Sequence, residues 1–348
     1  MIECSESKME RLIVHYIGNK HNEELCRFSN SLLKKLPEAI EEILCRYFLS
    51  PFKTNEYYHL THESDLNLNE MYTYACEIFD NTADFTDVSK KIGKHLYEQA
   101  THPKIKGGEF YAAYFSNCIV DGEETEAIGL FKSESKDTYL RVMPEKDSFN
   151  ISSEEGINIS KLEKGCLIFN TEKEKGFLVA VVDAGSKGNE AQYWKDHFLH
   201  LKNRSDSFHH TKNILTLCKH FVTDEMPEKF DLTRADQADM LNKSVKFFKE
   251  NENFEMKNFA QEVMQEPEVI KAFKDYKKQF QYDQDIEFED KFEISKPAVK
   301  KQQKIFKSVI KLDKNFHVYV HGDRELIEKG YDEDTKMHYY KLYFTEEE

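Results

Sequence analysis

Residues 110–142 constrain the fold more than any other part of the chain, because they predict three consecutive β-strands joined by short connections. The first strand is about ten residues long and rich in Tyr, Phe, Ile and Val. It ends at Asp121-Gly122, a dipeptide that supplies the positive-φ positions of a hairpin turn. A polar run separates the second strand, at 127–132, from the third, at 139–143. The pattern predicts an antiparallel meander.

The residues before this meander have the spacing of helices. Apolar residues recur at three- and four-residue steps from Leu33 to Tyr47, and Pro37 suits a first helical turn. A second helix is predicted over 72–79, and Thr86 is placed to cap a third. The sequence therefore predicts that the first hundred residues, roughly, are helical.

Two further apolar runs, at 165–169 and 177–183, predict two strands added to the same sheet. The small-residue cluster 184–188 follows them and favours a domain boundary. Its glycines lack the Walker spacing of a phosphate loop, so we interpret the cluster as a linker or turn. A chain of 348 residues suits two domains. We predict a domain of helices and antiparallel sheet at 1–186 and a helical domain with C-terminal strands at 187–348.

The second half of the chain begins with helices and ends with strands. Thr233 and Asp236 have the spacing of a capping box, and Pro267 opens another helix. Residues 316–320 alternate apolar and polar, and 339–344 are rich in aromatic residues, so both predict strands. Because strands come in groups, the sequence predicts an α+β fold. A helical N-terminal region leads into a mainly antiparallel sheet, and a C-terminal helical region ends in a short closing sheet.

Composition narrows the class of protein. Hydrophobic residues make up 39% of the chain and charged residues 32%, which is typical of a globular protein. No run approaches 18 apolar residues and the N-terminus lacks an apolar signal segment, so we expect a cytoplasmic protein with no membrane contact. Seven cysteines without a close pair fit neither a zinc site nor a disulfide framework. We expect no metal and no other cofactor.

One segment is basic although the chain as a whole is acidic. The chain carries a net charge of −15, yet residues 291–314 hold eight lysines against Glu293 and Asp313. That segment has a net charge of +6, which leaves −21 for the remainder. Because a uniformly acidic surface repels phosphates, a contact with nucleic acid is expected only where cations are concentrated.

The local structure of this lysine-rich segment has two alternatives. A continuous helix from Pro297 aligns four lysines in one stripe, namely Lys300, Lys304, Lys307 and Lys311. A strand from Ile305 instead turns at 313–315 and leaves two of these lysines on one face. We favour a helix that ends near Gln303 and a hairpin after it, because the following run is β-branched. A lysine run of this kind is equally typical of a solvated surface.

Passages spread along the chain occur in the same order in one known family. They are HYIGNK at 15–20, HLYEQATHPKIKGG at 95–108, AIGLFKSESK at 127–136 with YLRV after it, AQYW at 191–194 and EKGYD at 328–332. On these passages the sequence resembles the 37-kDa nucleoid-associated protein family of bacteria. The resemblance implies association with nucleoid DNA, and it implies no reaction.

With the lysine-rich segment, the resemblance favours a non-enzymatic, nucleoid-associated protein of the cytoplasm that binds double-stranded DNA. The residues expected at the DNA contact are Lys296, Lys300, Lys301, Lys304, Lys307, Lys311 and Lys314. A net-acidic protomer gathers more phosphate contacts by pairing two basic faces, so we expect a homodimer.

Two alternatives from other functional classes stay open. The net charge of −15 suits an adaptor that binds a protein partner at the nucleoid through its acidic surface. Asp121 with Glu134-Ser135-Lys136 loosely fits a metal-dependent nuclease, in which two carboxylates hold Mg²⁺ and a lysine polarises the attacking water. We rank the nuclease last, because acids and lysines are common in turns and polar loops.

Overall fold

The computed structural model describes residues 2–346 except 5, 54, 185–191, 285, 304, 305, 307, 308, 314 and 321–323. The chain divides into two compact units, unit 1 (Met1–Arg204) and unit 2 (Ser205–Glu348). The predicted division after residue 186 lies earlier, in a cluster that is outside the described residues apart from residue 184. Unit 1 extends further because the π-helical turn η4 (Tyr193–Phe198) fills its core and β10 (Leu201–Asn203) joins its sheet.

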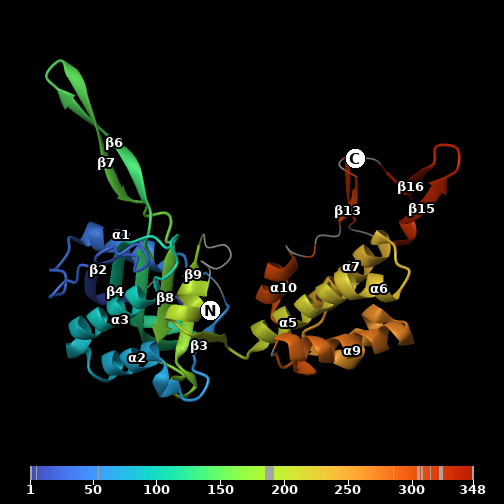
Figure 1. Ribbon diagram of the computed structural model, residues 1–348, viewed down its shortest axis with the longest axis horizontal. Coiled ribbons are helices and arrows are strands. Elements are labelled where there is room, and N and C mark those ends of the chain that lie inside the picture. Colours follow the sequence, from blue (N-terminus) through green and yellow to red (C-terminus); the bar gives the residue numbers. More distant parts are fainter. Residues whose placement is uncertain are drawn as a thin grey trace. The chain divides into compact units, whose positions relative to one another are not determined.

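The described part of unit 1 is built around an eight-stranded sheet (Figure 1). The strand order is β1-β4-β5-β8-β9-β3-β10, and β2 also pairs with β4. The bounds are β1 (Ile2–Glu3), β2 (Lys8–Ile17), β3 (Tyr58–Leu60), β4 (Gly108–Val120), β5 (Glu123–Ser133), β8 (Lys164–Phe169) and β9 (Leu178–Asp183). Neighbouring strands run antiparallel, as predicted. The strands predicted at 127–132, 165–169 and 177–183 are confirmed.

Helices cover both faces of this sheet. The helices α2 (Glu70–Asp80) and α3 (Phe85–Gln99) pack on one face, where Ala112 and Tyr114 of β4 are buried. The helix α1 (Glu38–Leu49) packs on the other face, over Tyr111 and Ala113. Because the central strands are buried on both faces, they read as continuous apolar runs rather than as alternating patterns.

The prediction that the first hundred residues are helical is wrong for β2. This ten-residue strand lies beside β4 from Lys8↔Ser116 to Ile17↔Gly108. The three helices predicted in the same region are confirmed as α1, α2 and α3. A strand of this kind is stabilised by its partner strand, which lies about a hundred residues later in the sequence. A search for helical spacing of apolar residues does not detect such a strand.

The third strand of the predicted meander pairs differently from the prediction. Residues 136–157 form a separate two-stranded ribbon of β6 (Lys136–Glu145) and β7 (Ser148–Ile157), which projects from unit 1 (Figure 1). The strand β8 lies beside β5 in its place. All six residues of β8 are buried, whereas β6 carries Lys, Asp, Thr and Arg side chains, whose burial is costly in a sheet covered on both faces.

Unit 2 is mainly helical. Its helices are α5 (Ser207–His220), α6 (Met226–Lys229), α7 (Arg234–Glu250), α8 (Met256–Phe259), α9 (Pro267–Gln284) and α10 (Lys296–Gln303). Phenylalanines dominate the core, among them Phe221, Phe248, Phe259 and Phe273. The capping box is confirmed, because Thr233 and Asp236 exchange hydrogen bonds at the start of α7. The helix that begins at Pro267 is also confirmed.

Short antiparallel strand pairs complete unit 2. They are β11 (Asn253–Glu255) with β12 (Lys291–Glu293), β13 (Val309–Leu312) with β14 (Phe316–Tyr319), and β15 (Ile327–Asp332) with β16 (Met337–Leu342). The favoured interpretation of the lysine-rich segment, a helix to Gln303 followed by a hairpin, is thus confirmed. The whole arrangement is the predicted α+β fold. Among the described helices, none is both long enough and apolar enough to cross a bilayer.

Candidate nucleic-acid interface

The lysines expected to contact DNA lie on two different elements of unit 2. Lys296, Lys300 and Lys301 are on α10, and Lys311 is on β13. Lys304, Lys307 and Lys314 lie outside the described residues. Because α10 ends at Gln303, the single helical stripe from Lys300 to Lys311 does not form.

The helix α10 is short and amphipathic. At its start, the Ser295 hydroxyl accepts a hydrogen bond from the Ala298 backbone N–H at 3.4 Å. Its apolar face buries Ala298 and Val299, and Lys300 and Lys301 are exposed. Burial of one face therefore fixes which lysines of this helix meet solvent.

Lys296 has a structural role. Its ammonium donates hydrogen bonds to the backbone carbonyls of Phe248 at 3.3 Å, Lys249 at 2.8 Å and Asn251 at 2.6 Å. These carbonyls belong to the C-terminal end of α7, where helical C=O groups lack intrahelical partners and a cation is favourable. Lys296 therefore caps the C-terminal end of α7 and holds α10 against α7.

Among the described lysines of this segment, Lys300 and Lys311 are the best placed to meet a ligand. Both are exposed, and within the described residues neither has a carboxylate partner. Lys311 lies opposite His317 in the hairpin, so that position of the ribbon has no acidic neighbour across the strand. The Lys301 ammonium lies 5.8 Å from the centroid of the Phe208 ring, which orients it over the start of α5.

One helix supports both lysine-bearing elements. The hairpin β13–β14 packs on the N-terminal part of α7, where Ile310 is buried in a cluster with Ala235 and Ala238. The Asn242 side-chain amide adds a hydrogen bond to the Val320 carbonyl at 3.1 Å. Since Lys296 holds α10 at the other end of α7, the exposed lysines are presented from elements that share one rigid support.

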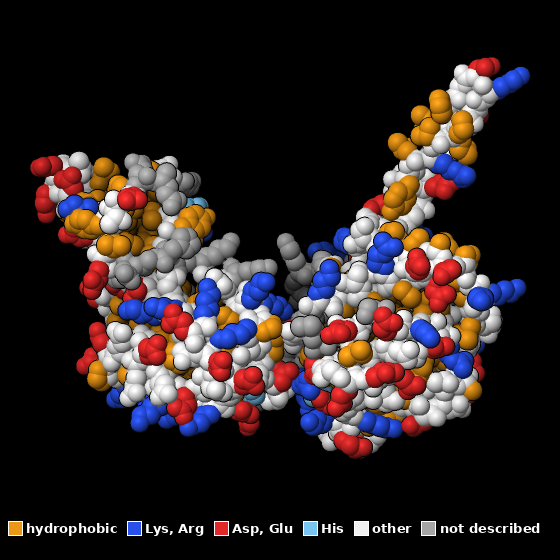
Figure 2. Space-filling view, turned by 180° about the vertical axis from the view of Figure 1, so that it is seen from behind, with side chains coloured by type: hydrophobic (Ala, Val, Ile, Leu, Met, Phe, Trp, Pro, Cys, Tyr) orange, Lys and Arg blue, Asp and Glu red, His pale blue; other side chains and the backbone are white. Residues whose placement is uncertain are grey.

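Acidic and basic side chains are interspersed on the face of each unit that Figure 2 shows. On this face the cations are not gathered into one large basic patch (Figure 2). A contact with phosphates then depends on the local arrangement of individual cations, such as those of α10 and β13.

A comparison with known protein families identifies the family to which this chain belongs. The family described as nucleoid-associated protein YejK matches residues 13–337. This chain belongs to that nucleoid-associated protein family. The matched region spans both units and includes the lysine-rich segment and the ribbon β6–β7. No curated protein matches the chain.

The structure does not bring together the residues of the nuclease alternative. Asp121 is in the turn that precedes β5, and Glu134 follows the other end of that strand. Eleven residues of strand separate the two carboxylates by roughly 35 Å at 3.3 Å per residue. In the described part of the chain, no group of three or more His, Cys, Asp or Glu side chains is arranged to hold a metal ion.

Asp121 instead takes part in an ion-pair network that closes unit 1. Arg204 donates to Asp121 at 2.7 Å and to Glu172 at 2.5 Å. The other carboxylate oxygen of Glu172 lies 2.6 Å from His59 Nε2. Burial lowers the pKa of His59, although the Glu172 carboxylate opposes the shift. The network ties two connections of the sheet, β4–β5 and β8–β9, and strand β3 to Arg204, the last residue of unit 1.

Sequence reasoning missed a cluster of buried charges in unit 1. The Lys132 ammonium is fully buried and donates to the Lys106 carbonyl at 2.6 Å and to the Glu134 carboxylate at 3.0 Å. It also lies 3.4 Å from the Tyr193 hydroxyl, and burial raises the pKa of that tyrosine. On the next strand, buried Lys164 pairs with Asp183. The position of Lys132 directly after the apolar run 127–131 was the available signal.

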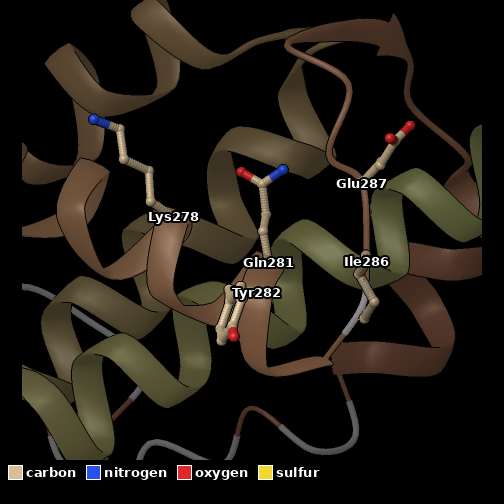
Figure 3. A pocket seen from close by; sticks show the side chains of 5 residues that line it. All are labelled: Lys278, Gln281, Tyr282, Ile286 and Glu287. Carbon is tan, nitrogen blue, oxygen red and sulfur yellow. The ribbon is translucent and has the colours of Figure 1, made fainter.

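A hollow of about 360 Å³ lies near the C-terminal end of α9. It is lined by Lys278, Gln281, Tyr282, Ile286 and Glu287 (Figure 3). The charged ends of Lys278 and Glu287 point away from each other, and the Tyr282 side chain is 85% exposed. A small-molecule site requires convergent polar groups in an enclosed cavity, and this hollow lacks both.

Proposed function

We propose that this protein binds double-stranded DNA of the nucleoid, in the cytoplasm, through exposed lysines of residues 296–314, and that it does so without catalysis. Membership of a nucleoid-associated family supports the location and the ligand. The observation that carries the proposal is the exposure of Lys300 and Lys311 without a described carboxylate partner. These cations belong to the one segment whose net charge is strongly positive.

The proposed contact is with phosphates rather than with bases. Each lysine that neutralises a phosphate releases about one condensed counterion, which provides a favourable and sequence-independent free energy of binding. The remaining surface carries a net charge of −21 and repels the duplex. Repulsion by the rest of the chain therefore favours contact with DNA at the lysine-rich segment.

The geometry supports a role without catalysis. The two carboxylates that fit a nuclease motif lie at opposite ends of β5, and each is paired with a cation of its own, Asp121 with Arg204 and Glu134 with Lys132. A two-carboxylate metal site needs its oxygens within about 2 to 2.6 Å of one ion. The arrangement of these residues is thus structural.

An adaptor function is the second candidate. The charge of −21 outside the lysine-rich segment favours it, because such a surface suits a basic protein partner. In that case the chain reaches the nucleoid through the partner and has no intrinsic affinity for DNA.

A gel-shift series at several salt concentrations, with and without Mg²⁺, separates these functions. Direct DNA binding predicts retention of the duplex that weakens steeply as salt rises and does not depend on Mg²⁺. The absence of retention at low salt supports the adaptor, and fragmentation of the duplex with Mg²⁺ supports the nuclease. Either of the last two results overturns the proposal.

A further inference from the structure

The sheet of unit 1 brings together two cysteines that are 114 positions apart in the sequence. The strand β1 pairs with β4 in an antiparallel register that ends at Glu3↔Ile119. The next step of this register places Cys4 opposite Cys118. The spacing of the cysteines along the chain gives no sign of this pair, because the pair depends on the contact between the start of the chain and β4.

Both side chains lie on the face of the sheet that α1 covers. Cys118 is fully buried in the apolar cluster on that face, and the half-buried Cys4 packs against the same cluster. The preceding opposite pair, Ile2 and Val120, packs in the same way. Opposite residues of an antiparallel pair have Cα atoms about 4.5 to 5.5 Å apart. Disulfides join Cα atoms that are about 4.4 to 6.8 Å apart, so a covalent link fits this pair.

A β-bulge in β4 directs Cys118 toward this face. Side chains of a strand alternate between the two faces, yet Phe115 and Cys118, which are three positions apart, lie in the same apolar cluster. The pairing of β4 with β5 shifts register between these two residues, and Asn117 has a φ of 56°. Without the shift, alternation would place the Cys118 thiol on the opposite face, under α2 and α3. The bulge therefore sets the thiol against Cys4.

Each of the two thiols has a larger effect on the pKa of the other than burial has. A hydrogen bond with the Cys118 thiol lowers the pKa of Cys4, burial opposes this shift, and Ser7 adds a smaller decrease. The same hydrogen bond raises the pKa of Cys118, and burial adds to the rise. These directions agree with exposure, because the half-buried member of the pair keeps its charge more easily than the fully buried one. Cys4 is therefore the thiolate of the pair.

The other cysteines have the opposite character. Burial is the largest influence on the pKa of each, and it raises the pKa of Cys26, Cys45, Cys76, Cys166 and Cys218. The thiolate, rather than the thiol, attacks oxidants and alkylating reagents. Cys4 is therefore expected to react before the others, which serve as controls within the same chain.

We propose that Cys4 and Cys118 form a peroxide-sensitive pair of thiols, in which Cys4 reacts with the oxidant and Cys118 then closes a disulfide that fastens β1 to β4. The pair rests as two thiols in a reducing environment, where disulfides form only transiently. A low-pKa, accessible cysteine beside a second cysteine is the arrangement found in redox sensors. The inference is independent of DNA binding.

Hydrogen peroxide supplies the oxidising equivalents. The Cys4 thiolate attacks one oxygen of the peroxide, the O–O bond breaks, and Cys4 becomes a sulfenic acid. The hydroxide that leaves takes up a proton and becomes water. The Cys118 sulfur then attacks the Cys4 sulfur, so that the S–S bond forms and the S–O bond breaks, and the departing hydroxyl leaves with the Cys118 proton as a second water. The two electrons lost by the thiols reduce the peroxide.

Peptide mapping after treatment with hydrogen peroxide tests the link. Trypsin releases Cys4 in peptide 1–8 and Cys118 in peptide 107–132, and neither peptide contains another cysteine. The oxidised full-length protein should yield these two peptides joined, with two hydrogen atoms fewer than the separate peptides, and should run as a monomer on a non-reducing denaturing gel. The absence of the joined peptide overturns the proposal. So does a joined peptide that occurs only in a covalent dimer.

Alkylation tests the division of roles within the pair. In the wild type, iodoacetamide should label Cys4 at least several-fold faster than Cys26, Cys45 and Cys76, the other half-buried cysteines. Cys118→Ala should slow the labelling of Cys4, because the hydrogen bond to the thiolate is lost. Equal rates for the four wild-type cysteines contradict the inference, and so does labelling of Cys4 that is as fast in the variant as in the wild type.

Thermal melting measures the fastening of β1. A disulfide between residues 114 positions apart restricts the unfolded chain, so the oxidised wild type should melt several degrees higher than the reduced protein. A thiol reductant should restore the original melting temperature. Cys118→Ala should show no rise after the same treatment, whereas Cys166→Ala, which removes a buried cysteine of β8, should keep both the rise and the joined peptide. Equal melting temperatures of the oxidised and reduced wild type contradict the proposal.

Discussion

The same residue type plays opposite roles in the two units. In unit 1, the side chains of Lys132 and Lys164 are 0% and 4% exposed, and each is paired with a carboxylate. In unit 2, Lys300 and Lys311 are exposed without a described carboxylate partner. The number of lysines alone therefore does not locate a DNA contact. A lysine can bind a phosphate only where its ammonium is exposed and is not already paired within the fold.

Desolvation explains the difference between the two groups of lysines. A buried ammonium is tolerated only with hydrogen bonds and an opposite charge nearby, and these partners then hold it in place. An exposed ammonium keeps its hydration, so it exchanges water for phosphate at little cost. Substitutions of a buried lysine and of an exposed lysine test this difference.

The largest effect is expected from Lys132→Met. Removing the ammonium leaves the Lys106 carbonyl and the Glu134 carboxylate without their partner, and loss of one member of a buried pair costs about 3 to 5 kcal/mol. Urea unfolding followed by the fluorescence of Trp194, which is buried in unit 1, measures the loss. The control Lys300→Met should change the free energy of unfolding by less than about 0.5 kcal/mol. Similar losses in the two variants contradict the contrast.

A second buried group should make the stability of unit 1 depend on pH. His15 is 2% exposed, its Nδ1 accepts a hydrogen bond from the Ser29 backbone N–H at 3.1 Å, and its Nε2 lies 3.0 Å from the Ser89 hydroxyl. Burial, with a smaller contribution from Lys90, lowers its pKa from 6.5 to about 4. The folded state therefore holds a neutral ring that the unfolded chain protonates first.

The sign of the pH dependence follows from that depressed pKa. The contribution of His15 is fully present above pH 6.5 and is lost as pH falls toward 4, by about 3 kcal/mol in total. Urea unfolding at pH 7, 5 and 4, again followed by Trp194, should show a shallower decline in His15→Gln than in the wild type. If the free energy of unfolding declines equally in the two proteins, groups other than His15 cause the acid sensitivity, and the prediction is wrong.

A smaller effect is expected from Lys296→Gln. This change weakens the hydrogen bonds to the last carbonyls of α7 and removes a cation from the negative end of that helix. We expect a loss of about 1 kcal/mol from unit 2. Hydrogen exchange of amides in α7 and α10 should detect it, and Lys300→Gln, on the same helix, serves as the control. Unchanged exchange in Lys296→Gln contradicts a capping role.

Local signals in the sequence predicted local structure well. The turn at Asp121-Gly122 has positive φ at both residues, as the dipeptide predicts, and the capping box at Thr233 forms as expected. The change from helix to hairpin after Gln303 also follows from the β-branched run. Each of these features is determined by interactions between residues a few positions apart. The local sequence is therefore sufficient to predict it.

Features that depend on distant partners were not predictable in the same way. The choice between β6 and β8 as the neighbour of β5 depends on which strand tolerates burial on both faces. The use of Lys296 as a cap depends on the end of α7, which is 45 residues or more away in the sequence. The DNA contact at this segment stays a prediction, and the division of its lysines between structure and solvent required the fold.

The salt dependence of DNA binding tests the central claim most directly. The variant combines Lys300→Gln, Lys301→Gln and Lys311→Gln, and the control combines Lys34→Gln, Lys35→Gln and Lys53→Gln, which are exposed lysines of unit 1. Both lose the same charge. The measured quantity is the slope of log affinity against log salt, from gel shifts or fluorescence titrations.

If the lysine-rich segment contacts DNA, the variant should bind every sequence more weakly, and its slope should be shallower by about 3, roughly one unit per lost phosphate contact. Its melting temperature should equal that of the wild type, and the control should keep both affinity and slope. A variant that melts normally and binds with unchanged affinity and slope contradicts the account, and it shows that these lysines are only a solvated surface.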